Sequence, residues 1–158
     1  MTQENGKQPT MNRTLREAYS ALVNVMKAGK LPIHSVKSRL ALNRNSLRPL
    51  VAALEESQND LLQDAGCRMT EGGGLVVVDE DVRGIPARLK RIDEVQKQLK
   101  ALAEAETEWA PVARIELRKF PDESEVDGND LAALMEAGIV TGEPLESSPD
   151  AKRKASEG

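Results

Sequence analysis

Two runs of apolar residues at helical spacing occupy the N-terminal part of the chain, separated by a short break at residues 29–32. The first run consists of Leu15, Ala18, Leu22, Val25 and Met26. Steps of three and four place these side chains on one face of a helix over about residues 14–28. Because Gly29 and Leu31-Pro32 end that helix, the two runs predict an antiparallel hairpin of two helices, 14–28 and 33–65.

The second run is interrupted by polar residues and a proline. Its apolar positions are Ile33, Val36, Leu40, Leu47, Leu50, Leu54 and Leu61. Asn43 stands where the stripe should continue. Pro49 removes one helical hydrogen bond and clashes with a carbonyl one turn back, at a cost of about 3 kcal/mol. We therefore expect two segments, 33–43 and 46–65, with a bend between them.

Further elements follow in the C-terminal part. An apolar seam predicts a third helix over 85–106, and a β-rich run after three glycines predicts a strand at 75–78. Alternation over 111–120 predicts a second strand, paired with 75–78, and residues 128–137 read as a short helix. The expected fold class is α+β, mainly α: an N-terminal antiparallel helical hairpin, a third long helix and a small two-stranded sheet.

Both ends of the chain are polar. Residues 1–11 and 142–158 carry few side chains that a core could bury, so we expect two disordered tails around one helical domain, 12–141. The aromatic residues are few, Tyr19, Trp109 and Phe120, which argues against a platform for stacking bases. A single cysteine, Cys67, excludes an intramolecular disulfide framework. With no long apolar run and no signal-peptide core, we expect a soluble protein without a membrane partner.

Charge is divided unevenly along the chain. Residues 1–54 contain nine Lys and Arg against two Asp and Glu, a net charge of +7. The remaining residues contain 13 Lys and Arg against 24 Asp and Glu, a net charge of −11. Such asymmetry indicates either a solvated basic face, contacts between the halves of one or more chains, or an acidic partner for the basic half.

The order of elements resembles that of small proteins from tailed bacteriophages and prophages. The features that carry the resemblance are an N-terminal helix, Leu31-Pro32 opening a long helix, the stretch 50–56, a charged helix, an alternating strand and an acidic, Leu-rich end at 130–139. Pro49 departs from this pattern, in which the helix is continuous. The resemblance implies a phage protein acting in the host cytoplasm or in the virion. It supplies no functional residues.

No catalytic, cofactor or metal site is expected. His34 is the only histidine and reads as a surface or capping residue. The acidic residues 79–81 lack the rest of a calcium loop, and the glycines 72–74 precede a strand, unlike a phosphate-binding loop. The acidic run at 122–130 reads as solvated. Cys67 follows a helix C-terminus, where the dipole disfavours a thiolate.

These observations predict a non-enzymatic protein–protein interaction protein that oligomerises through its helical seams and docks an acidic protein partner. The expected partner-binding residues lie in the basic helical hairpin: Lys37, Arg39, Arg44, Asn45 and Arg48. The alternative is a DNA-binding regulator in which residues 33–57 form a helix–turn–helix. In that reading the second helix begins near Ser46 and presents Arg44, Asn45 and Arg48 to the major groove.

Overall fold

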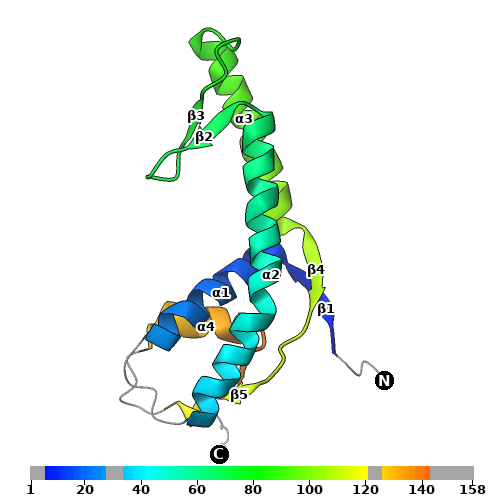
Figure 1. Cartoon of the computed structure of the whole chain (residues 1–158), viewed down its shortest axis with the longest axis vertical. Helices are drawn as coiled ribbons and strands as arrows, with labels where there is room; N and C mark the ends of the chain where they lie inside the picture. The colour runs from blue at the N-terminus through cyan, green and yellow to red at the C-terminus, as the bar shows by residue number, and fades with distance from the viewer. Residues whose placement is uncertain (1–5, 28–33, 121–125, 143–158) are drawn as a thin grey trace, which may run out of the picture.

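The computed structural model describes residues 6–27, 34–120 and 126–142. Within these residues the chain forms an elongated molecule with a body at one end and a long arm at the other (Figure 1). The helices are α1 (Asn12–Lys27), α2 (His34–Asp64), α3 (Ile85–Glu104) and α4 (Gly128–Glu136), with a 3-10 turn at Leu117–Lys119. The strands are β1 (Gln8–Met11), β2 (Cys67–Met69), β3 (Leu75–Val77), β4 (Glu106–Trp109), β5 (Ile115–Glu116) and β6 (Val140–Thr141). The fold is therefore α+β and mainly α, as predicted.

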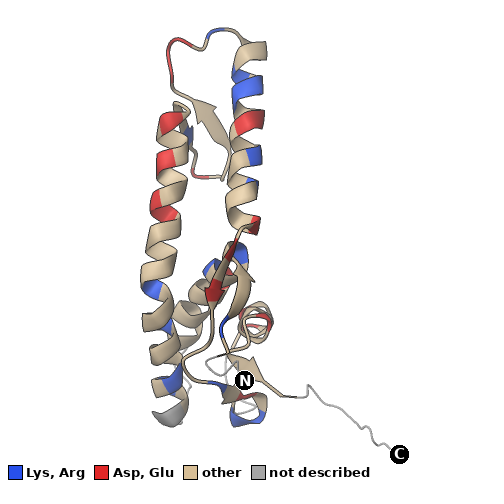
Figure 2. Ribbon diagram, turned by 90° about the vertical axis from the view of Figure 1, so that its right-hand side faces the viewer, with Lys and Arg blue, Asp and Glu red and all other residues tan. Residues whose placement is uncertain are grey.

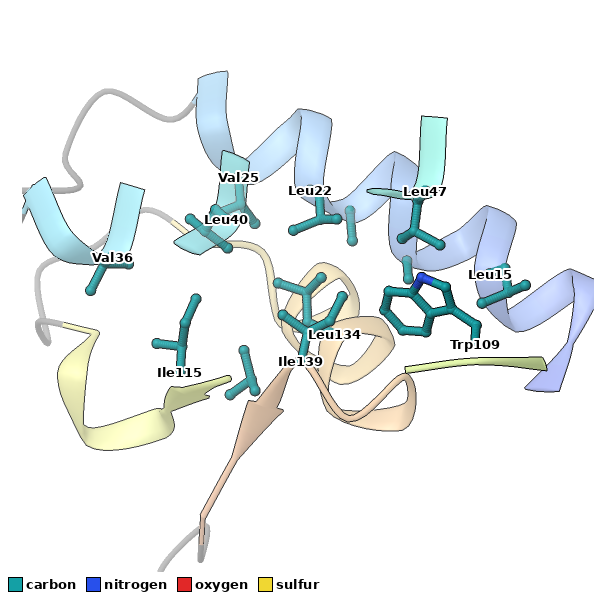
Figure 3. Packing of buried hydrophobic residues seen from close by; sticks show 13 residues of the cluster. Leu15, Leu22, Val25, Val36, Leu40, Leu47, Trp109, Ile115, Leu134 and Ile139 are labelled. Atoms are coloured by element: carbon teal, nitrogen blue, oxygen red, sulfur yellow. The ribbon is translucent and has the colours of Figure 1, made fainter. Parts of the chain in front are cut away.

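The body is built around α1, the N-terminal half of α2, and α4. As expected, α1 and α2 form an antiparallel hairpin: Arg16 near the start of α1 donates to Gln58 of α2 at 2.9 Å. The two apolar stripes meet α4 and the segment after β4 in one core (Figure 3). Its buried members are Leu15, Ala18, Ala21, Leu22, Val25, Val36, Leu40, Leu47, Trp109, Ile115, Leu134, Ile139 and Val140.

The arm consists of the C-terminal half of α2, the antiparallel helix α3 and the β2–β3 hairpin laid against them (Figures 1 and 2). A second, smaller core holds it together, with Leu62, Cys67, Val77 and Val95 buried. Gly66 ends α2 at a φ of 66°, and its carbonyl accepts from the amides of Val78 (2.7 Å) and Asp79 (3.1 Å). The arm thus depends on far fewer buried side chains than the body.

Helix α2 is continuous through Pro49, so the expected division into segments 33–43 and 46–65 is wrong. Pro49 lies on the exposed side of the helix. A proline there leaves the carbonyl one turn back facing water, and a helix that curves around a core is convex on that side. Asn43, read as a polar interruption, is 0% exposed and points into the body.

The strand pairing also differs from the prediction. Leu75–Val77 pairs with Cys67–Met69 in an antiparallel hairpin, not with 111–120. Within 111–120 only Ile115–Glu116 is a strand, and it pairs in parallel with Val140–Thr141. Strands β2 and β3 pair with each other because they are close in the sequence. Thr70 closes the turn between them, since its hydroxyl accepts from the Gly74 amide at 3.0 Å.

Residues 8–11, which the sequence assigned to a disordered tail, are strand β1. It pairs antiparallel with β4, from Gln8 opposite Trp109 to Met11 opposite Glu106. Asn12 then joins the two ends: its amide nitrogen donates to Leu102 and its backbone N–H to Ala105, both at 2.8 Å. The rest of the predicted tails, residues 1–5 and 143–158, lies outside the described residues.

Helix ends agree with prediction more closely at α4 than at α1. Helix α4 ends at Glu136, one residue before the predicted end at 137, and Gly138 follows with a φ of 79°. Helix α1, however, begins at Asn12, two residues before the predicted start at about residue 14, and Thr14 is a buried helical residue. Its hydroxyl lies 3.4 Å from a carboxylate oxygen of Glu136, so it links α1 to α4.

Candidate interaction surfaces

All five predicted partner-binding residues lie on α2, in the part that belongs to the body. Lys37, Asn45 and Arg48 are exposed, Arg44 is half-buried, and the stretch has no turn at 42–44. The helix–turn–helix prediction for 33–57 is therefore wrong, because Arg44, Asn45 and Arg48 sit in the middle of one helix. They do not occupy the N-terminus of a recognition helix, from which major-groove reading is made.

The five residues do not form one surface. At 100° per residue, Lys37, Arg44 and Arg48 lie within about 40° of one another, whereas Arg39 lies on the opposite flank. Arg39 is used inside the chain, because its guanidinium donates to the carbonyl of Arg114 at 2.7 Å. The Nε of Arg44 is buried with no hydrogen-bond partner. The structure thus places three cations of the predicted set on one side of the helix, whereas the fourth, Arg39, is exposed and hydrogen-bonded to Arg114.

Asn43 explains why this region of α2 reads as irregular. Its amide nitrogen donates to the carbonyls of Arg39 (2.9 Å) and Ala113 (2.7 Å), and its oxygen accepts from the amide of Val112 (2.9 Å). Three residues further on, Ser46 accepts from the indole nitrogen of Trp109 at 3.1 Å. These side chains fix the extended segment 109–114 across α2. The polar residues of the stripe are therefore structural.

Exposed apolar side chains gather on the arm. Of the large apolar residues, Ile85 is 72% exposed and Leu89 is 60% exposed, the highest values among the described residues. Val78, at the end of the β2–β3 hairpin, is 51% exposed. Ile85 and Leu89 belong to the seam that predicted α3, and they lie one turn apart on the flank that continues to the half-buried Ile92. The seam therefore extends beyond the part of α3 that has a partner.

Helix α3 outruns α2 at the far end of the arm. Arg91 donates to the carbonyl of Ala65 at 2.6 Å, which places the end of α2 level with Arg91. Residues 85–90 of α3 extend past this level by about 9 Å, at a rise of 1.5 Å per residue. Figure 2 shows α3 reaching beyond the end of α2. We call residues 83–90 the α3 overhang.

The α3 overhang is basic. From 82 to 92 the sequence contains Arg83, Arg88, Lys90 and Arg91 and no Asp or Glu. Arg91 is balanced by Asp79 at 3.9 Å and Glu94 at 4.0 Å. Arg83 and Arg88 donate to backbone carbonyls of the preceding loop, at 3.4 and 3.1 Å, without a carboxylate partner. Arg83, Arg88 and Lys90 thus form no ion pair with a described residue, although Asp81 and Glu94 line an open hollow together with Arg83 and Lys90.

The neighbouring half of α2 has the opposite sign. Residues 50–64 contain Glu55, Glu56, Asp60 and Asp64 and no Lys or Arg. All four acids are exposed, and none forms an ion pair with a described residue. Figure 2 shows this acidic stretch on the upper half of α2, above the cations of the body. Charge on α2 thus changes sign where the body gives way to the arm.

The cavities do not assemble a recognisable reaction centre. An open groove of about 620 Å³ lies between α1, α4 and the end of α3, where Arg13 and Arg16 face Glu17 and Asp130. Cations and anions in it balance one another. Among the described residues, no three His, Cys, Asp or Glu side chains are placed to share a metal ion. The side chain of His34 lies outside the described part.

Cys67 is a buried residue of the arm core. Desolvation raises the pKa of its thiol; nearby Arg91 lowers that pKa, and Asp79 raises it. The net direction is upward, so the thiol stays protonated at neutral pH, where the thiolate would be the reactive form. This agrees with the expectation that Cys67 is a poor nucleophile.

Comparison with protein-family models, with curated proteins and with solved structures finds no match for this chain. Of the helices in the described residues, none is both long enough and apolar enough to cross a bilayer. The surfaces of the molecule itself are therefore the guide to its function. The α3 overhang, which the sequence did not single out, has the strongest combination of apolar exposure and unpaired charge. A sequence signal was present: a seam with cations and no acid over 82–92.

Proposed function

We propose that this chain is a non-enzymatic protein–protein interaction protein that docks an acidic protein surface through the α3 overhang. The observation that carries the proposal is the exposure of Ile85 (72%) and Leu89 (60%) on a helical face with no partner in the described chain. The body supplies a large core and holds α2, while the arm presents the overhang far from it (Figure 1).

Burial of the two side chains provides the driving force. Complete burial of an Ile or Leu side chain stabilises a complex by about 1.5–3 kcal/mol. Because most of each side chain is still exposed, a partner that covers both gains about 1–2 kcal/mol from each one. An apolar centre with a polar rim is the usual arrangement of a protein–protein interface.

Charge selects the partner. At 100° per residue Arg88 lies beside the apolar pair and Lys90 on the adjoining flank, while Arg83 precedes the helix; none of the three has an ion-pair partner among the described residues. A surface with Asp and Glu around an apolar depression complements this pattern and accelerates the encounter. The same charges repel a basic surface. We therefore assign partner binding to the overhang and not to Lys37, Arg44 and Arg48. The reason is that the large apolar side chains of the body are less exposed than Ile85 and Leu89.

The resemblance of the element order to small phage proteins supports a bacteriophage setting. In that setting the partner would be a phage-encoded protein, in the virion or outside it, or a host factor met in the cytoplasm. Neither alternative changes the surface that we assign.

A photo-crosslinking amino acid placed at Ile85 tests the assignment in the cells that produce the protein. The matched control places it at Leu42, a body residue of α2 that is 46% exposed. We expect a discrete crosslinked protein, identified by mass spectrometry, from position 85 and not from position 42. Binding of that protein should be lost in I85E/L89E and kept in L42E/V112E, which changes two exposed apolar residues of the body. The reverse pattern would refute the proposal.

A further inference from the structure

We infer that the acidic surface recognised by the α3 overhang is the outer face of α2 in a second copy of this chain. This inference rests on the proposed function and identifies its partner. In the resulting pair, two arms lie antiparallel about a twofold axis, and the overhang of each copy packs on the acidic half of α2 in the other.

The outer face of α2 has the shape that the overhang needs. Pro49, Ala52, Ala53, Glu56 and Asp60 recur at steps of three and four and are all exposed. Ala52 and Ala53 have small side chains, so a second helix can approach this face closely and fit larger side chains against it. Ile85 and Leu89 are such side chains. The face is also outside both cores, so binding a helix there requires no rearrangement of the described chain.

Electrostatic complementarity distinguishes this face from the others. The overhang carries Arg83, Arg88 and Lys90, and the outer face of α2 carries Glu56 and Asp60, with Glu55 beside them. Neither set finds ion-pair partners within the described chain, although both lie on the same arm. Within one chain α3 runs beside the inner flank of α2, and its overhang projects beyond the end of α2, so the two sets do not meet. An antiparallel second copy brings them together.

The twofold arrangement also addresses the size of the contact. A single overhang of about two turns is a small patch, whereas stable interfaces bury about 1,600 Å² in total. In an isologous pair each chain contributes both its overhang and its acidic face, so the contact occurs twice.

Sedimentation velocity on the full chain at low and high salt measures this association. We expect a dimer at about 100 µM in low salt that dissociates as salt is raised. R88E/K90E and E56K/D60K should each weaken dimerisation by about thirtyfold, because every contact then places like charges together. Both variants keep the apolar contacts and suit their helix positions, since Glu is favourable near an N-terminus and Lys near a C-terminus.

The decisive experiment mixes the two variants. In a mixed pair the Glu side chains on the overhang of R88E/K90E meet the Lys side chains on α2 of E56K/D60K. The second contact joins the unchanged basic overhang of E56K/D60K to the unchanged acidic face of R88E/K90E. A heterodimer should therefore form from two weakly associating proteins. K37E/R48E, which makes the same change of charge on the body, should dimerise like the original chain.

A monomer at about 100 µM in low salt would overturn the inference, and so would a mixture that does not restore association. Crosslinking at position 85 separates this failure from failure of the proposed function. A crosslink to a different acidic protein would keep the function and reject the second copy. No crosslink at position 85 would reject both.

Discussion

Replacing Asn43 with alanine tests the internal framework that holds the body together. The side chain is 0% exposed and makes two hydrogen bonds to a distant segment, to the Ala113 carbonyl and the Val112 amide. Each contributes about 1 kcal/mol net, and N43A leaves both backbone groups without their buried partner. The third bond, to Arg39 one turn back, is local and adds little. With the small cavity included, we expect N43A to lower the free energy of unfolding by about 3 kcal/mol.

Urea denaturation followed by far-ultraviolet circular dichroism measures this change, and the melting temperature should fall by on the order of 10 °C. N45A is the matched control, because Asn45 is exposed on the same helix and the gain in helix propensity is the same. N45A should change the free energy of unfolding by no more than about 0.5 kcal/mol. Equal stability of N43A and N45A would show that Asn43 does not anchor the segment.

Three further predictions concern the arm and the long helix. The pKa of the buried Cys67 thiol is raised, so the stability that the protonated thiol contributes is complete below the unfolded pKa and is lost as pH rises through the folded pKa. C67A should therefore lose less stability than the original chain between about pH 8 and pH 10, and identical pH profiles of the two proteins would contradict this. P49A should raise the free energy of unfolding by about 2 kcal/mol in thermal denaturation, since Pro49 is exposed inside a continuous helix; a lower melting temperature would refute this account. G66A should destabilise the chain by about 3 kcal/mol in urea denaturation, because a Cβ at φ 66° would lie 2.5 Å from the Cβ of Asp79. G73A, with open space around it, should cost about 1 kcal/mol, and equal losses in the two variants would contradict the clash at Gly66.

Helical spacing was sufficient to predict α1, α3 and α4, but not the continuity of α2. The stripe of α1 predicted its buried face, and the seam over 85–106 predicted α3 to within two residues of its end. Gly138 marked the end of α4. These signals are local, since they depend on residues within one or two turns of each other. They can therefore be recognised in the sequence without knowledge of how the rest of the chain folds.

The strand pairs were harder because they join segments that are far apart in the chain. Nothing local to residues 8–11 indicates that Thr10 faces Thr107, almost a hundred positions later. Strands of two to four residues also carry too little alternation to specify a register. The prediction of a break at Asn43 was wrong for another reason. A polar residue in an apolar stripe gives the same sequence pattern whether it interrupts the helix or is buried with hydrogen-bond partners. Only the position of Ala113 separates the two cases.

The seam of α3 shows a further limit of pattern reading. Ile85 and Leu89 fit the seam as well as Val95 does, yet Val95 is 1% exposed and Ile85 is 72% exposed. Spacing says which face of a helix is apolar but not how far the neighbouring helix extends. The end of α2 at Gly66 sets that limit, and the α3 residues beyond it have no helix of the described chain beside them.

The charges of α2 give an independent reason to look outside the chain for partners. A helix is stabilised by acids near its N-terminus and by cations near its C-terminus. Helix α2 has the opposite order, with Lys37 near its start and Asp60 and Asp64 near its end, at a cost of about 0.3–1 kcal/mol for each charge close to a terminus. None of these three charges is offset by an ion pair in the described residues. They therefore do not stabilise the helix that carries them. For Asp60 the role that we propose is contact with the overhang of a second copy, whereas Lys37 lies outside the proposed contact.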